Sequence, residues 1–122
     1  MDGRRRFEDL VAQALRDLPD QFQRRLDNVD VVVETWPSRG QLARVHLGPS
    51  GVLFGLYEGV PLLRRTRAYG LVPPDRITIF QGPIEAFCRT PGAIRRKVRE
   101  VVVHEIAHHF GIDDRRLREL GI

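Results

Sequence analysis

The chain is 122 residues long, which is the length of one ordinary domain and leaves no room for separate cofactor and substrate modules. Hydrophobic residues make up 42% of it and charged residues 30%, so the composition supports one buried core and excludes a disordered chain. The formal net charge is +4. Because the basic residues are scattered among acidic ones, we expect solvated surface charge without a specific nucleic-acid partner, in a single domain over residues 1–122.

The expected compartment follows from the single cysteine and from the distribution of apolar residues. Cys88 cannot form an internal disulfide, which favours a reducing environment. Charged residues interrupt the N-terminal segment where the apolar part of an export signal would lie. The longest apolar run, residues 52–57, is far shorter than the roughly 18 residues that a membrane-spanning helix needs. We therefore expect a soluble, cytoplasmic protein with no membrane partner.

The N-terminal part of the chain predicts a helix followed by a strand. Apolar residues recur at three- and four-residue steps over residues 7–18, which is typical of an amphipathic helix, and Pro19 ends it. Consecutive valines predict a strand over residues 29–35, closed by a turn at residues 36–40.

The middle of the chain predicts further short strands. A segment around residues 44–47 is a candidate to pair with the first strand, and residues 52–57 predict a second strand. Residues 59–75 resemble a long, basic connection, after which residues 77–80 predict a third strand. A short apolar segment at residues 84–87 follows.

The C-terminal part of the chain is helical in pattern. A helix is expected over residues 91–110, with a proline where the first turn tolerates one and Gly111 where helices commonly stop. A short helix over residues 115–120 ends the chain. This order of elements predicts an α+β domain in which a small sheet packs against helices.

The long C-terminal helix carries the pattern H-E-x-x-H, at His104, Glu105 and His108. Two histidines four residues apart project from one face of a helix, so their ring nitrogens can converge on one metal ion, with the glutamate displaced toward water. His109 lies in the same polar arc, which spans about 140° at about 100° per residue. The rest of this half of the helix is apolar around its circumference. A buried helix with one polar arc of this kind is a candidate site for metal-assisted hydrolysis.

The residues after the motif offer a third ligand. Gly111 lets the backbone leave the helix with a positive φ, and three residues later Asp114 can return its carboxylate toward the ion. Two imidazoles and one carboxylate leave a fourth zinc position open, as in catalytic sites. Asp113 is the alternative ligand, and otherwise a residue that supports the site or the helix end.

The extended motif, His104-Glu105-x-x-His108-x-x-Gly111-x-x-Asp114, resembles that of the aspzincin-type metallopeptidases. Four segments are also similar to the small bacterial minimal zincins, a metallopeptidase family, namely residues 29–34, 55–61, 74–80 and 102–111. The resemblance covers most of the chain. It implies a minimal zincin-like fold with a short mixed sheet and an active-site helix. It also implies a Zn2+ cofactor and a peptide or protein substrate.

We interpret the chain on this basis as a zinc-dependent metallopeptidase in which zinc activates water and Glu105 is the general base. Tyr57, Tyr69 and His109 are candidates for donating to the oxyanion. By resemblance, residues 52–57 would bind extended substrate through the backbone.

Two other functions are compatible with the sequence. The chain could be a zinc-binding scaffold or regulatory module without hydrolytic activity. It could also be a metal-dependent ribonuclease, whose motif resembles H-G-x-x-H-x-x-G-x-x-H. Glu105 and Asp114 replace a glycine and a histidine of that motif, which places this function below a peptidase.

Overall fold

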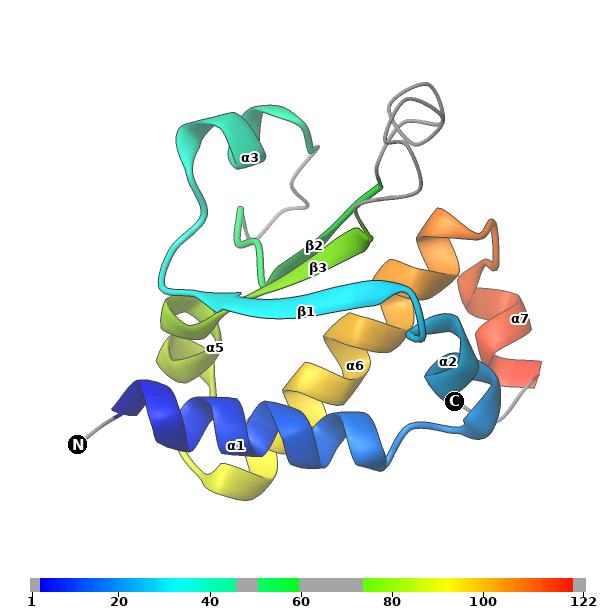
Figure 1. Ribbon diagram of the computed structural model, residues 1–122. Helices are drawn as coiled ribbons and strands as arrows, with labels where there is room; N and C mark the ends of the chain where they lie inside the picture. The colour runs from blue at the N-terminus through cyan, green and yellow to red at the C-terminus, as the bar shows by residue number, and fades with distance from the viewer. Residues whose placement is uncertain (1–2, 46–50, 60–73, 120–122) are drawn as a thin grey trace.

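A computed structural model of the protein describes residues 3–45, 51–59 and 74–119. Its centre is a three-stranded mixed sheet in the order β1-β3-β2 (Figure 1). The helices and strands in chain order are α1 (Gly3–Arg16), α2 (Asp20–Arg25), β1 (Val29–Glu34), α3 (Arg39–Ala43), β2 (Gly55–Glu58), β3 (Asp75–Phe80), α5 (Gln81–Phe87), α6 (Pro91–His109) and α7 (Asp114–Glu119). The predicted α+β class and mixed sheet are confirmed.

The strand register places the two outer strands on either side of Ile77 in β3. β1 runs parallel to β3 with Val31 opposite Ile77, and β2 runs antiparallel to it with Tyr57 opposite the same residue. Residues 77–80 of β3 are all buried, as expected for a central strand covered on both faces. Within the described residues, β1 and β2 are the two edges of the sheet.

The hydrophobic core lies between the sheet and two helices on one of its faces. Figure 1 shows α1 and α6 together on this face and α3 on the other, and α1 packs directly on α6. Fully buried members of the core come from both helices and from β3: Phe7, Ala14, Ile77, Ile79, Val98, Val102 and Ile106. The core therefore holds α6 firmly against the sheet over most of its length.

Local signals explain both ends of α6. Thr90 is the N-cap, and its side chain accepts a hydrogen bond from the Ala93 N–H at 3.1 Å, with Pro91 in the first turn. The helix ends at His109, and Gly111 follows with φ of 76°. A positive φ is strained for residues with a Cβ, so Gly111 is where the chain can turn away. The predicted helix and its stop are confirmed.

The sequence-based interpretation was wrong in the segment after β1. The predicted turn at residues 36–40 runs directly into helix α3, whose N-cap Ser38 accepts from the Gln41 N–H while the Gln41 side chain accepts from the Ser38 N–H. Arg44 caps the C-terminal end of this helix. Residues 44 and 45 are therefore not a strand, and residues 46 and 47 lie outside the described residues.

Other differences concern short elements and boundaries. Helix α2 was not predicted, and the apolar segment at residues 84–87 is the end of helix α5. Both helices are too short for a periodic pattern to stand out. The second strand begins at Gly55 instead of residue 52, and the third begins earlier than expected, at Asp75. The connection expected at residues 59–75 falls mostly outside the described residues.

Candidate active site

The two motif histidines lie one turn apart on the same side of α6. The ring centroids of His104 and His108 are 6.1 Å apart, and the ring planes are within 11° of parallel. His104 is half-buried and His108 is exposed. Both rings are therefore at least partly accessible on this side of α6.

The remaining faces of α6 anchor this part of the helix. Val102, Val103, Ile106 and Ala107 are buried in the core. The histidines project from a different arc of the helix, which they share with the buried Val101. Because the buried residues alternate with the motif residues, the backbone beneath the histidines cannot shift without disturbing the core.

Glu105 lies between the histidines and is held by the neighbouring strand. Its Oε1 accepts a hydrogen bond from the backbone N–H of Tyr57 at 2.9 Å. Burial raises the pKa of this carboxyl above its ordinary value, and the Tyr57 N–H and the charges of His108 and His104 oppose part of that rise. The result is a carboxylate with a fixed orientation whose pKa is shifted toward neutrality.

The ladder of hydrogen bonds explains why the Tyr57 N–H faces α6. The Phe80 N–H donates to the Phe54 oxygen at 3.0 Å, and in an antiparallel pair the residues that exchange such bonds alternate with residues whose polar groups point outward. With the backbone groups of Phe54 pointing toward β3, Gly55 and Tyr57 present their N–H and C=O groups to the side of β2 that faces away from β3. The Glu105 carboxylate meets one of these outward groups.

Gly55 allows β2 to approach α6 closely enough for this bond. A Cβ at position 55 would lie 2.4 Å from Val101 Cγ1 and 3.1 Å from the Thr78 carbonyl oxygen. Contacts of 2.4 Å are not possible between carbon atoms. The absence of a side chain at this position therefore sets the distance between the strand and the helix.

The Tyr57 side chain is held on two sides. Its hydroxyl donates to Asp75 Oδ2 at 2.6 Å, and its ring stacks on His109 with centroids 3.9 Å apart and planes within 20°. Phe110 packs edge-on against His109, and the Arg25 guanidinium lies 4.4 Å from the centre of the Phe110 ring. Tyr57 and His109 therefore contact one another, and the Tyr57 hydroxyl proton is directed at Asp75.

The two candidate carboxylates after the motif occupy different positions. Asp113 precedes α7, and its Oδ1 accepts from the Arg116 N–H at 2.8 Å while its carbonyl accepts from Leu117 at 3.0 Å. This is the geometry of a helix N-cap. Asp114 is the first residue of α7, and its side chain lies outside the described part of the structure, as does Tyr69.

The donor atoms near α6 suit a zinc ion in kind. Two imidazoles at a spacing of four residues are a usual pair of zinc ligands, and a carboxylate from the following turn would complete a three-ligand set. Among the described side chains alone, no group of three His, Cys, Asp or Glu is arranged to hold a metal ion. Asp114, the third ligand predicted from the sequence, has a side chain that does not belong to that described set.

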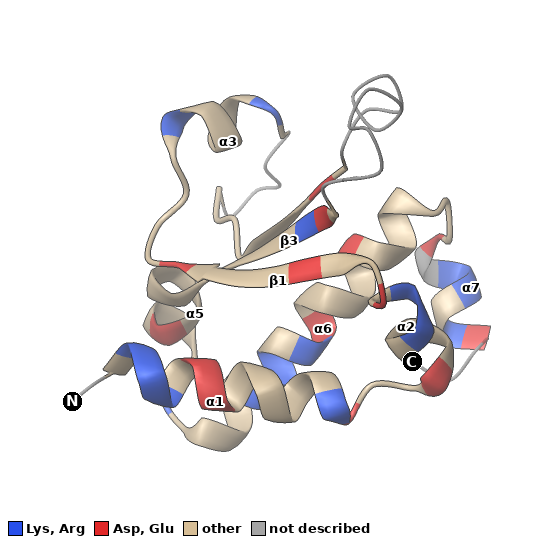
Figure 2. Cartoon of the chain, viewed as in Figure 1, with Lys and Arg blue, Asp and Glu red and all other residues tan. Residues whose placement is uncertain are grey.

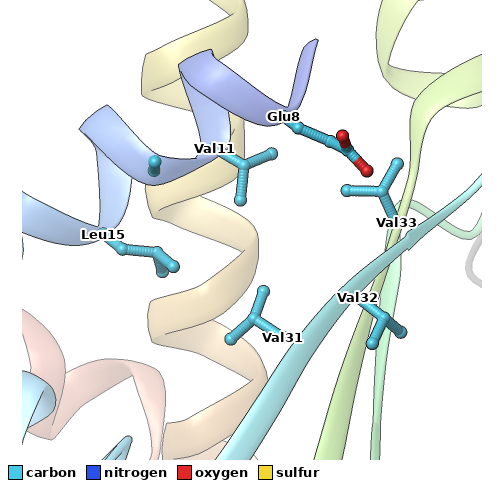
Figure 3. A pocket seen from close by; sticks show the side chains of 7 residues that line it. Glu8, Val11, Leu15, Val31, Val32 and Val33 are labelled. Carbon is cyan, nitrogen blue, oxygen red and sulfur yellow. The ribbon is translucent and has the colours of Figure 1, made fainter. Parts of the chain in front are cut away.

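A cavity between α1 and β1 lies away from these residues. It has a volume of about 430 Å³ (Figure 3) and is lined by Glu8, Val11, Ala12, Leu15, Val31, Val32 and Val33. This lining has one carboxylate and no imidazole, so it lacks the donors of a metal site. Within the described residues, the chemistry suited to a metal is concentrated at α6 and β2.

Comparison with known proteins identifies the family of this chain. A family model for zincin-like metallopeptidases matches residues 26–122, a range that includes β1, β2 and the whole of α6. The chain belongs to the zincin-like metallopeptidase family. A solved structure of a conserved hypothetical protein from Thermus thermophilus is similar with a TM-score of 0.52 and 25% sequence identity, covering 86% of this chain and 91% of that one. No curated protein matches the chain.

This membership confirms the predicted resemblance and fold. None of the helices in the described part of this zincin combines the length and apolar character needed to cross a bilayer. Lysine and arginine occur on several elements with acidic residues between them, as Figure 2 shows for α1, α2, α6 and α7.

Sequence reasoning missed Asp75 and the backbone donor at Tyr57. A backbone N–H has no residue type that marks it, because every residue except proline carries one. The signal that was available is the glycine at position 55 beside an expected edge strand, since glycine in a strand often marks a close approach of two backbones.

Proposed function

We propose that this zincin is a zinc-dependent peptidase that hydrolyses peptide bonds beside β2, at the histidine-bearing side of α6. The observation that supports this most strongly is Glu105, a carboxylate between two histidines that is half-buried, oriented by a backbone donor and shifted in pKa toward neutrality. A surface glutamate with only a structural role needs none of these three features.

His104, His108 and Asp114 are the residues we propose to hold the metal. Bound zinc would supply Lewis acidity toward a peptide carbonyl and toward water. Asp113 is not proposed as a metal ligand, because its carboxylate caps α7. By holding the start of α7, it would fix the position of the neighbouring Asp114 backbone.

Glu105 is the proposed general base and acid. A base works best when its pKa is near the working pH, and burial moves this carboxyl in that direction. The Tyr57 N–H binds Oε1, which leaves Oε2 to accept a proton from water and to deliver it later to the leaving amine. A fixed carboxylate also avoids the loss of rotational freedom at the moment of reaction.

The open side of β2 is the proposed binding edge for an extended peptide. Gly55 and Tyr57 present backbone groups outward there, as edge strands do when they accept an added strand. Because Glu105 already binds the Tyr57 N–H, we assign substrate pairing to the backbone groups of Gly55. Tyr57 and His109 are then positioning residues in this proposal, not the donors to the oxyanion.

The test combines metal content with hydrolysis of a tryptic proteome digest used as a peptide library. The wild type should contain about one zinc ion per chain and should cleave library peptides, while Glu105→Gln should keep the zinc and lose the cleavage. Glu100→Gln is the matched control, since Glu100 is an exposed glutamate on the same helix.

Two other outcomes would overturn the proposal in favour of a named alternative. A wild type that holds zinc but cleaves no library peptide would indicate a scaffold or regulatory module. Salt-dependent binding and cleavage of a single-stranded RNA, with no peptide cleavage, would indicate the ribonuclease.

A further inference from the structure

An aromatic pair with a large exposed surface lies beside the start of β2. The rings of Phe54 and Phe87 meet edge to face with centroids 5.4 Å apart. Phe87 is 62% exposed at the end of α5, whereas Phe54 is half-buried. Lys97 Nζ covers Phe54 at 4.3 Å from the ring centre and also pairs with Glu100 at 3.3 Å.

This pair lies at one end of the side of α6 that carries the motif histidines. Lys97, Val101, His104 and His108 follow one another at steps of four, three and four residues, which places all four on one helical face. β2 runs along that face, with Phe54 at Lys97, Gly55 against Val101, and Tyr57 at Glu105. The aromatic pair and the histidines therefore lie at two ends of one helical face that the same strand follows.

The distance between the aromatic pair and the histidines can be estimated from the helix. Lys97 precedes His104 by seven residues, or about 10 Å at 1.5 Å per residue. An extended peptide advances about 3.3 Å per residue, so about three residues of substrate span the same distance. A side chain at the aromatic pair would thus belong to the residue about three positions from the bond that reacts at the histidines.

We infer that Phe54 and Phe87 form a subsite for a bulky apolar side chain, aromatic above all, about three residues from the scissile bond. The inference rests on the proposed peptidase function and names its substrate class. An apolar occupant fits this pair. Among the described residues, Lys97 is the cation that lies on it, and Lys97 already contacts Glu100 and the ring of Phe54. An incoming ring can meet the exposed edge and face of Phe87, and it removes that surface from water.

The experiment is cleavage-site profiling of the tryptic proteome library with the zinc-loaded full chain. Wild type should favour Phe, Tyr, Trp and Leu over Ala by about 2- to 10-fold at the third position to one side of the cleaved bond, the range that aromatic contacts support. Phe87→Ser should abolish this preference. Trp36→Ser is the control, because Trp36 is similarly exposed, at 61%, but lies after β1 with its ring against Gly82.

Each result bears on the inference. Loss of the preference in Phe87→Ser, with Trp36→Ser like wild type, would support it. Cleavage without an aromatic preference, or a preference that survives Phe87→Ser, would overturn the subsite while leaving the peptidase intact. No cleavage by wild type would overturn the proposed function and the subsite with it. Thermal unfolding of Phe87→Ser should match wild type, since the side chain it removes is mostly exposed.

Discussion

Replacing Tyr57 by phenylalanine isolates the part that its hydroxyl plays in holding Glu105. The substitution removes the 2.6 Å bond to Asp75 but keeps the ring on His109 and the backbone N–H on Glu105. If the side chain positions the strand, loosening it must reduce the time that Glu105 spends in its reactive orientation. The expected result is a lower kcat with little change in KM.

The size of the effect follows from the bond that is lost. Hydrogen bonds to charged groups contribute about 1.5–3 kcal/mol, and because both side chains are only half-buried we expect the lower end, about 1.5 kcal/mol of unfolding free energy. If about 1 kcal/mol of that restraint acts on Glu105, kcat falls about 5-fold. Asp75→Ala should match this loss, whereas Asp75→Asn, which keeps an acceptor oxygen, should recover part of it.

Two measurements separate positioning from general destabilisation. Amide hydrogen exchange should speed up at Tyr57 in the variant, a readout that needs no substrate. Ile94→Val is the control, since it removes a methylene from the same helix far from the histidines at a cost of about 0.5–1.5 kcal/mol. If Tyr57→Phe loses stability but keeps the kcat of Ile94→Val, or if the Tyr57 amide stays as protected as in wild type, the reasoning is refuted.

Three further predictions address the ligands, the helix end and pH. Asp114→Ala and His104→Ala should lose zinc, as measured by elemental analysis. Asp113→Ala should keep the zinc but lose about 1 kcal/mol of unfolding free energy, because it removes the N-cap of α7; denaturant unfolding measures this loss. The opposite pattern for Asp113 and Asp114 would show that their roles are interchanged. Gly111→Ala should cost about 1–2 kcal/mol because of its φ of 76°, and an unchanged unfolding midpoint would contradict that conformation. For the metal-free protein, a raised folded pKa of Glu105 means that the folded state binds more protons above pH 4.5, so stability falls as pH rises from there to the raised pKa. Glu105→Gln should remove that fall in urea unfolding measured across this range, and a parallel pH dependence in both proteins would count against the burial of Glu105.

The long periodic elements were predictable from the sequence, and the short capped ones were not. Pro91, an apolar repeat and Gly111 predict α6, and a run of valines predicts β1. Helix α3 depends on two reciprocal hydrogen bonds between Ser38 and Gln41, a local signature that the turn-like residues around it obscured. Such helices are decided by their caps because they are too short to have an apolar face.

The motif predicted which residues of α6 carry the chemistry, but it could not predict what lies opposite them. His104, Glu105 and His108 share a face because of helical spacing alone. The contact between Glu105 and Tyr57 joins residues 48 positions apart in the sequence. It depends on the strand order and on which groups of β2 point outward, and neither property is written in a local pattern.

Gly55 links the position of strand β2 to the orientation of Glu105. A methyl group there would have to move from 2.4 Å to at least 3.4 Å from Val101 Cγ1, an atom of a stiff, β-branched side chain whose helix is held in the core. The strand would therefore have to move away by about 1 Å, and a shift of that size would lengthen the 2.9 Å bond from Tyr57 to Glu105 beyond the range of a hydrogen bond. A residue that has no side chain thus determines whether the carboxylate is oriented. The same closeness contributes to the burial that raises its pKa, so the geometry and the basicity of Glu105 have a common structural origin.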